Sequence, residues 1–306
     1  METFTGMVVR TDGPQVTVRD PAGREWRCVL RGRLRKLLSG ATNPVAVGDR
    51  VEVLPIGVDE GAVETVLPRR SRLARRPPLG GRRTLGRSPR EHVLAANLDL
   101  AVIVVAAPPR PTVIDRYLAL VRAGGCEALL CVNKIDLVDR AAVESAIGPY
   151  RLAGVPVLLT SALDGCGVDE LRTWLAKRLV AFIGPSGAGK SSLLNVIDPA
   201  LNLRVGGLNA SGKGVHTTSW AATYQVADGF VVDTPGLREI GFLENEGREA
   251  TDALFPEITA LATGCHFRDC THTHEPRCAV KAMLDAGDLD PAVYTRYARL
   301  ARSGRV

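Results

Sequence analysis

The chain has 306 residues, of which 45% are hydrophobic and 24% charged, an ordinary globular composition that allows two or three domains and a sizeable buried core. No stretch approaches the roughly 18 apolar residues of a membrane span, and the first residues lack the basic segment and apolar run of a secretory signal, so we expect a soluble cytoplasmic protein. The net charge of +6 comes from one segment of the chain. Nine arginines and no acid lie between residues 69 and 90, which leaves about −3 for the rest of the chain.

Residues 1–68 are predicted to form a small β-barrel. Five short apolar segments alternate with turn signals, at residues 6–10, 15–19, 25–30, 50–54 and 62–67. The break after the third segment, and Gly48-Asp49 before the fourth, fit the five-stranded OB-type barrel, a scaffold that often binds oligonucleotides. We therefore expect an RNA-binding barrel, although a fold alone does not establish that use.

Residues 69–92 are predicted to be a linker or loop, because arginine, proline and glycine dominate and little apolar surface can be buried. Clustered arginines release counterions from phosphate backbones and bind phosphates bidentately. We expect this segment to contact RNA. A solvated tether is the alternative interpretation.

Residues 93–241 are predicted to form an α/β domain, because apolar strands alternate with helical stretches. The expected strands cover residues 98–106, 128–132, 155–160, 179–183 and 230–232. This alternation predicts a mostly parallel sheet with helices on both faces. Ligands bind such sheets beyond the carboxyl ends of the strands, where each of the following motifs lies.

A phosphate-binding loop follows the expected strand 179–183. The segment from Gly184 to Ser191 fits the pattern G-x-x-x-x-G-K-[ST] and opens a helical run. Its backbone N–H groups and the helix N-terminus favour phosphate oxygens, Lys190 neutralises β/γ charge, and Ser191 can ligate Mg²⁺. The predicted nucleotide contacts of this loop are Gly184, Pro185, Ser186, Gly187, Ala188, Gly189, Lys190, Ser191 and Ser192.

The segment Asn133-Lys134-Ile135-Asp136, after the expected strand 128–132, selects the base. The Asp136 carboxylate can accept hydrogen bonds from guanine N1–H and the 2-amino group, which adenine lacks, and the Lys134 stem can lie against the base. After the next strand, the N–H of Ala162 could meet guanine O6. The two segments together predict GTP instead of ATP, with contacts from Asn133, Lys134, Ile135, Asp136, Ser161 and Ala162.

Two later segments are predicted to sense Mg²⁺ and the γ-phosphate. After strand 230–232, Asp233 can reach Mg²⁺ through water, and the N–H of Gly236 can contact the γ-phosphate. Between this segment and the phosphate loop lie Thr217 and Thr218, of which Thr218 is the preferred Mg²⁺ ligand. The guanine motif thus precedes the phosphate loop, which predicts a circularly permuted GTPase domain.

Residues 242–306 are predicted to form a helical zinc-binding domain. Cys265, Cys270, His272 and Cys278 have the spacing C-x₄-C-x-H-x₅-C, and three thiolates with one imidazole complete a tetrahedral structural zinc site. His266 and His274 are competing candidates that spacing alone leaves open. The odd total of seven cysteines, three of them beside histidines, favours a metal over disulfides.

The barrel, the permuted motifs and the Cys₃His module, in this order, resemble the bacterial small-ribosomal-subunit biogenesis GTPases of the RsgA family. Further matching segments are residues 95–99, 115–117 and 265–270. The resemblance implies a late-acting assembly factor on the small subunit, and we expect this factor to bind the subunit and its ribosomal RNA as a monomer. The resemblance also implies slow GTP hydrolysis that the subunit stimulates. Our hypothesis is that hydrolysis then releases the factor.

One departure from ordinary GTPases concerns the water that attacks GTP. Leu237 stands where Ras-like proteins carry the glutamine that orients this water. The resemblance implies that His216, in the Gly214–Thr218 segment, orients the water instead. An RNA-binding scaffold that uses GTP only as a binding switch is the alternative function, and an ATP-dependent kinase is poorly compatible with Asp136.

Overall fold

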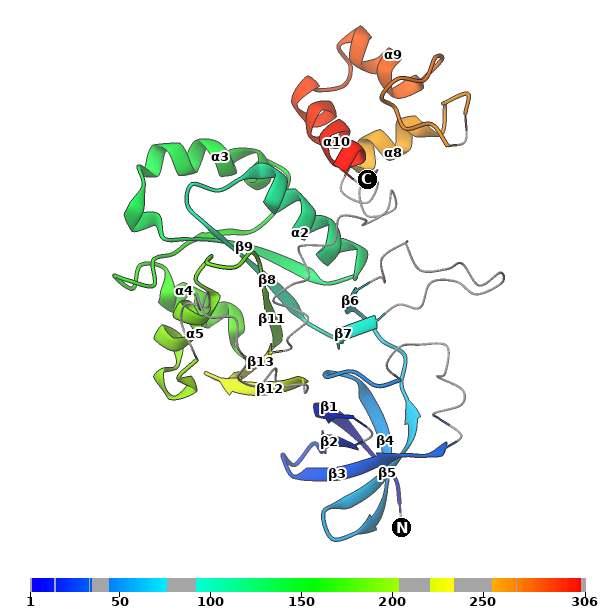
Figure 1. Ribbon diagram of the computed structural model, residues 1–306, viewed down its shortest axis with the longest axis vertical. Helices are drawn as coiled ribbons and strands as arrows, with labels where there is room; N and C mark the ends of the chain where they lie inside the picture. Colours follow the sequence, from blue (N-terminus) through cyan, green and yellow to red (C-terminus); the bar gives the residue numbers. More distant parts are fainter. Residues whose placement is uncertain are drawn as a thin grey trace, which may run out of the picture.

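The computed structural model describes residues 2–13, 15–32, 34, 44–75, 92–203, 221–233, 255–267 and 269–303. Three bodies follow one another along the chain: a barrel near the N-terminus, a sheet with flanking helices in the middle, and a helical module near the C-terminus (Figure 1). None of the helices in these ranges is long and apolar enough to cross a membrane.

The N-terminal body is a closed barrel. Its strands are β1 (Phe4–Asp12), β2 (Gln15–Arg19), β3 (Glu25–Leu30), β4 (Arg50–Gly57) and β5 (Glu60–Val66). They are ordered β1-β2-β3-β5-β4, and β4 pairs back with β1; the β3–β5 pair is parallel and the others are antiparallel. Alternating β-branched residues fill the interior, which suits a pleated and half-buried surface. The predicted OB-type barrel is confirmed.

The central body contains a mostly parallel sheet, as predicted. Its strands are β8 (Leu100–Ala106), β9 (Glu127–Asn133), β10 (Val157–Leu159), β11 (Leu179–Ile183), β12 (Ala221–Val226) and β13 (Gly229–Asp233). The order is β10-β9-β8-β11-β13-β12, and every neighbouring pair is parallel except the β12–β13 hairpin. The five expected strands correspond to β8, β9, β10, β11 and β13, whereas β12 is absent from the prediction.

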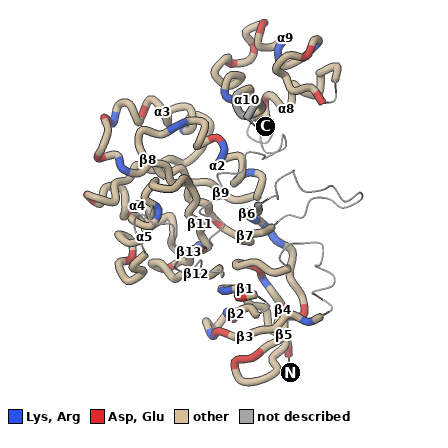
Figure 2. Tube along the Cα trace, viewed as in Figure 1, with Lys and Arg blue, Asp and Glu red and all other residues tan. Residues whose placement is uncertain are grey.

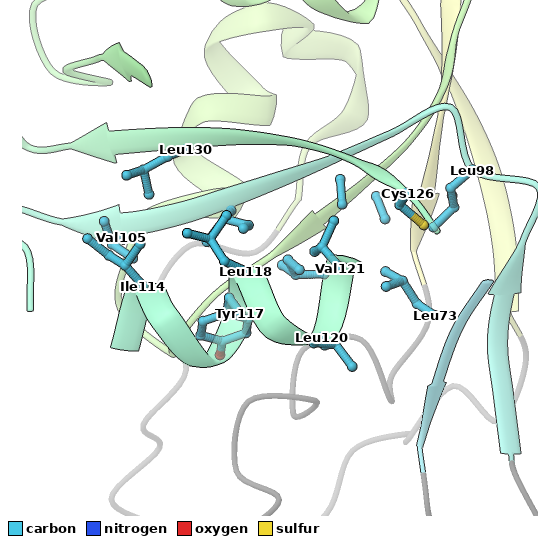
Figure 3. Close-up of a cluster of buried hydrophobic side chains, with 14 of the residues drawn as sticks. Leu73, Leu98, Val105, Ile114, Tyr117, Leu118, Leu120, Val121, Cys126 and Leu130 are labelled. Atoms are coloured by element: carbon cyan, nitrogen blue, oxygen red, sulfur yellow. The ribbon is translucent and has the colours of Figure 1, made fainter. Parts of the chain in front are cut away.

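Helices cover both faces of this sheet. They are α2 (Pro111–Ala123), α3 (Arg140–Leu152), α4 (Val168–Leu175) and α5 (Lys190–Ile197), with the 3₁₀ turns η1 (Ile135–Leu137) and η2 (Pro199–Leu201). Successive strand residues point to opposite faces. Ile103 and Val105 pack against α2 and α3 in one buried cluster, part of which Figure 3 shows, while Val102 and Val104 pack against α4 and α5 in another.

A short hairpin joins the barrel to the sheet. It consists of β6 (Arg72–Arg75) and β7 (His92–Ala96), and Leu73 of β6 is fully buried near Val121 and Cys126 (Figure 3). The predicted loop over residues 69–92 is therefore wrong for residues 72–75, because one buried leucine anchors them as a strand, and for His92, which begins β7. Residues 76–91 lie outside the described ranges.

The barrel and the central sheet are also continuous through backbone hydrogen bonds. Strand β1 pairs antiparallel with β12, with Arg10 opposite Ala222 and Thr11 opposite Ala221. This pairing joins the two bodies into one sheet of 11 strands. The barrel is thus attached to the strand next to β13, at whose end a predicted Mg²⁺-sensing residue lies.

The C-terminal module has a core of its own. Its helices are α8 (Pro256–Ala262), α9 (Ala279–Ala286) and α10 (Pro291–Ser303). Phe255, Ile258, Val280, Leu289 and Tyr297 are buried together with two of the cysteines. So few apolar residues suggest that a bound metal adds to the stability of the module.

Candidate nucleotide-binding site and metal centre

The predicted phosphate loop connects the end of β11 to α5, which begins at Lys190. Gly184 has φ 141°, and a Cβ there would lie 2.0 Å from the carbonyl oxygen of Val104. Only glycine allows this approach of the loop to β8. The Nζ of Lys190 donates to the carbonyl oxygens of Gly184 (2.7 Å) and Pro185 (2.9 Å), which brings its charge back over the loop.

The side chain of Asn133 connects the predicted base-reading and phosphate-binding segments. Asn133 ends β9 and is 1% exposed. Its Nδ2 donates to the carbonyl oxygen of Ala188 in the phosphate loop (2.9 Å). Its Oδ1 accepts from the N–H of Ala162 and the hydroxyl of Thr160, both at 3.3 Å. One buried amide therefore fixes three chain segments relative to one another.

The carboxylate of Asp136 is held by a buried serine. Lys134 has φ 64°, which starts the η1 turn carrying Asp136. Ser161 is fully buried, and its Oγ donates to Asp136 Oδ1 at 2.7 Å while accepting from the N–H groups of Leu163 and Asp164. The hydroxyl of Ser161 is thus used both as a donor and as an acceptor, and it orients the carboxylate that is predicted to read guanine.

Asp233 lies at the same edge of the sheet as the phosphate loop. It ends β13, which runs parallel to β11 with Val232 opposite Ala181. The predicted motifs at residues 133–136, 161–162, 184–192 and 233 all follow or end strands of this sheet, which brings them to its carboxyl edge. The remaining predicted residues, His216, Thr217, Thr218, Gly236 and Leu237, lie outside the described residues.

The four predicted metal ligands come together in the C-terminal module. The ligand atoms of Cys265, Cys270, His272 and Cys278 all lie within 4.8 Å of one another. His272 Nδ1 is 3.4 Å from the Sγ atoms of Cys265 and Cys278, which are 3.8 Å apart. Tetrahedral zinc, with Zn–S of about 2.3 Å and Zn–N of about 2.0 Å, requires S···S and S···N separations of about 3.8 and 3.5 Å. The cluster therefore fits a tetrahedral ion.

Neither alternative histidine belongs to this cluster. The side chain of His274 is 72% exposed and lies beside Glu275, and the ring of His266 packs edge-on against Phe267. The choice between the three histidines depends on the path of the loop, which spacing alone does not give.

Glu275 organises the loop between Cys270 and Cys278. Its carboxylate accepts from the N–H groups of Thr271 (2.9 Å), Thr273 (3.1 Å) and His274 (3.2 Å). Burial opposes its charge, but the hydrogen bonds from Thr271 and His274 outweigh this and hold the pKa of Glu275 well below its usual range. The loop that presents His272 is thus fixed by an ionised side chain that is not itself a ligand.

Two comparisons with known proteins identify the family. Residues 66–243 match the model of the RsgA GTPase family. The small ribosomal subunit biogenesis GTPase RsgA of Gemmatimonas aurantiaca is 39% identical over 303 residues, which cover 97% of this chain and 96% of that protein. The protein of the same name from Porphyromonas gingivalis is 38% identical over 305 residues, covering 95% and 94%. The chain belongs to the RsgA GTPase family.

Solved structures agree with this assignment. YjeQ from Thermotoga maritima is 30% identical to this RsgA-family chain, with a TM-score of 0.71 and 99% of both chains covered. YloQ, described as a circularly permuted GTPase, is 27% identical with a TM-score of 0.67, covering 99% of this chain and 96% of its own. The protein is therefore a GTPase, and the predicted permuted order of its motifs is confirmed.

Sequence reasoning missed three residues that support these two sites. Thr160 donates to Asn133, Glu275 organises the metal loop, and the hydroxyl of Tyr294 donates to the carbonyl oxygen of His272 at 2.7 Å. An acid inside a Cys/His loop is a signal that could have drawn attention to Glu275. The contact of Thr160 lies between the two segments predicted to read guanine, but no pattern singles out its hydroxyl, and the contact of Tyr294 joins two segments whose proximity no local pattern indicates.

Proposed function

We propose that this RsgA-family GTPase acts in late maturation of the small ribosomal subunit. In this proposal it binds the subunit and its ribosomal RNA, hydrolyses GTP to GDP and phosphate with stimulation by the subunit, and is released as a consequence. The observation that carries the proposal is the near full-length similarity to proteins named small ribosomal subunit biogenesis GTPase RsgA. We further propose that it acts as a cytoplasmic monomer.

The proposed guanine site consists of Asn133–Asp136, Ser161 and Ala162. Its support is the hydrogen bond from Ser161 to Asp136, which leaves the acid oriented for guanine N1–H and the 2-amino group. Asn133 ties this site to the phosphate loop at Ala188. Base recognition and phosphate binding are therefore proposed to be organised by one buried amide.

The proposed phosphate site consists of residues 184–192 with Asp233, Thr217, Thr218 and Gly236. The backbone N–H groups of the loop and the N-terminus of α5 favour the β- and γ-phosphates, and Lys190 supplies a positive charge. Mg²⁺ bound with GTP would neutralise charge developing on the phosphate oxygens. Ser191 and Thr218 would ligate this ion directly, and Asp233 would hold it through water.

His216 is the proposed catalytic residue: Leu237 has no group that could orient water, and the resemblance to the RsgA family implies that His216 takes this role. The imidazole would position the attacking water in line with the γ-phosphate.

The proposed metal of the C-terminal module is one structural zinc ion held by Cys265, Cys270, His272 and Cys278. The support is the donor set and its tetrahedral separations. Four protein ligands leave no position for a reacting water, so the ion would stabilise the module without taking part in hydrolysis.

The barrel and the arginine-rich segment are the proposed contacts with ribosomal RNA. Figure 2 shows basic residues on β1 and beside β6 and β7, where the barrel meets the sheet. Two arginines of this region also have internal partners: Arg69 pairs with the buried Asp49 at 2.7 Å, and Arg70 pairs with Asp99 at 3.2 Å. Arg69 in particular is proposed to support the fold, with RNA contacted by other arginines of the segment.

Single-turnover GTP hydrolysis with and without purified small subunits tests the proposed function. We expect a large acceleration by the small subunit and little by the large subunit, which serves as the control polyanion. Equal hydrolysis rates for the protein alone, with the small subunit and with the large subunit would instead favour the alternative, an RNA-binding scaffold that uses GTP only as a binding switch.

A further inference from the structure

The C-terminal module and the central body meet at a small contact beside α2 and α3, where α10 lies next to α2 (Figure 1). Among the described residues, the two bodies have separate buried clusters. A cleft of about 370 Å³ separates them at this point. It is lined by Pro111, Ala146 and Pro149 on one side and by Pro291, Ala292 and Thr295 on the other. Apolar packing across the contact is therefore incomplete.

An ion pair between Asp115 of α2 and Arg296 of α10 bridges this contact. Two nitrogens of the guanidinium lie 2.7 and 3.3 Å from the carboxylate oxygens, and the side chain of Asp115 is only 3% exposed. The hydroxyl of Tyr150, near the end of α3, donates to the same carboxylate at 2.9 Å. The guanidinium carbon lies 4.8 Å from the centroid of the Tyr150 ring. The central body thus presents a buried carboxylate and an aromatic face that receive one arginine.

Such a contact is suited to open and close as a unit. Removing one partner leaves a buried charge without compensation, which is costly, whereas separating both partners returns both charges to water. Since the described residues of the two bodies share no buried cluster, little apolar area among them opposes this separation. The Asp115 carboxylate therefore requires the Arg296 guanidinium when the bodies are together, and the two bodies can still separate.

The C-terminal module is attached to the GTPase domain in two ways, by the ion pair and by the chain itself. The ion pair lies on the guanine side of the proposed nucleotide site, and the chain leaves the domain on the phosphate side. Asp115 lies on the helix after β8, and Tyr150 lies on the helix that follows the guanine segment 133–136. The chain reaches the module from Asp233 at the end of β13, on the phosphate side. We propose that Asp115, Tyr150 and Arg296 form a releasable latch that holds the C-terminal module on the guanine half of the GTPase domain.

Hydrogen–deuterium exchange and small-angle X-ray scattering of the full-length, metal-loaded protein test the latch. Arg296→Met removes the charge from the module, Asp115→Asn removes it from the GTPase domain, and Lys281→Met is the control that removes a positive charge from α9. We expect both latch variants to exchange the amides at the start of α2 and in α10 at least tenfold faster and to have a larger radius of gyration. The control variant should have the exchange rates and the radius of gyration of the wild type. In all three variants the amides of α4 and α5 should exchange at the wild-type rate.

Two results would overturn the latch. Wild-type exchange and radius of gyration in both variants would mean that the ion pair does not hold the module. A change in Arg296→Met alone, together with loss of its bound metal, would mean that the arginine serves the folding of the module. Asp115→Asn lies outside the module, so its effect on α10 distinguishes the latch from such a structural role.

Discussion

At the scale of single residues, Asp136 should decide which base the protein accepts. Its carboxylate, oriented by Ser161, accepts from two guanine donors in the proposed site. Asp136→Asn should weaken GDP binding by about 3 kcal/mol, roughly 100-fold, because hydrogen bonds to a charged acceptor are lost. Xanthine carries a carbonyl at C2 to which the new amide can donate, so the variant should prefer xanthosine diphosphate. Calorimetric titration with both nucleotides measures this, and Asp164→Asn on the neighbouring exposed loop is the control.

His216 should affect turnover without affecting affinity. In the proposed mechanism its imidazole orients water and does not hold the nucleotide. His216→Ala should therefore bind GTP as the wild type does but lose subunit-stimulated turnover by roughly 10²- to 10⁴-fold, the usual contribution of a positioned acid–base group. Stimulated single-turnover rates at saturating GTP measure the effect. Wild-type acceleration in this variant would remove His216 from the mechanism.

At the scale of elements, the phosphate loop and β9 should depend on each other through Gly189. A Cβ at this position would lie 2.2 Å from Nδ2 of Asn133, and φ is 95°. Gly189→Ala should displace Asn133 from Ala188 and cost about 3 kcal/mol of unfolding free energy, through strain and a lost buried hydrogen bond. Gly187→Ala is the matched variant, because its φ is 78° but nothing lies within 4 Å, so only about 1–2 kcal/mol of backbone strain is expected. Urea denaturation of the nucleotide-free protein compares the two variants. Equal losses of unfolding free energy would show that the contact between Gly189 and Asn133 adds nothing to the backbone strain.

The join between the barrel and the sheet should depend on Asn97. This residue is 4% exposed, its Oδ1 accepts from the N–H of Arg70 at 2.8 Å, and its Nδ2 donates to the carbonyl oxygen of Gly48 at 3.0 Å. Asn97→Ala removes the partner of the buried Gly48 carbonyl and of the partly buried Arg70 N–H, and should cost about 2–4 kcal/mol. Arg70→Met should cost less than about 1 kcal/mol, because the Arg70 side chain is 70% exposed in its pair with Asp99. Denaturation midpoints measure the difference, and similar losses in the two variants would show that Asn97 is not the residue that holds the join.

Strands were predictable where burial leaves a clear pattern and missed where it does not. The run Leu100–Ala106 is apolar throughout because both of its faces are covered, and the barrel strands alternate because one face is solvated. Strand β6 buries Leu73 within an arginine-rich segment, so its composition resembles a loop. Strand β12 mixes Tyr224 and Gln225 with alanines and is recognised only by its pairing with β13 and β1.

At the scale of the whole molecule, the sequence locates motifs but not the contacts between them. Asn133 and Ala188 are 55 residues apart, and Asp115 and Arg296 are 181 residues apart, yet each pair is hydrogen-bonded. Periodicity and spacing report only local structure, so neither contact could be inferred. The four metal ligands lie close together in the chain, which is why their spacing alone pointed to one centre.

Removing the metal should separate the stability of the module from that of the GTPase domain. The module has a small core that includes Cys270 and Cys278, whereas the core around α2 and α3 contains none of its described residues. Because binding free energy of a structural metal is folding free energy, chelation should unfold the module. GDP affinity should remain within about twofold, since its proposed site lies in the other body, and subunit-stimulated turnover should fall to the basal rate.

Hydrogen exchange along the chelated protein, with a GDP titration on the same sample, measures both effects. Among the described residues, the increase in exchange on chelation should be confined to the C-terminal module and the start of α2, where the Asp115–Arg296 contact is lost. The control is reloading with zinc, which should restore slow exchange and stimulated turnover together. A parallel loss of GDP binding on chelation would show that the two bodies fold as one cooperative unit, in spite of their separate cores.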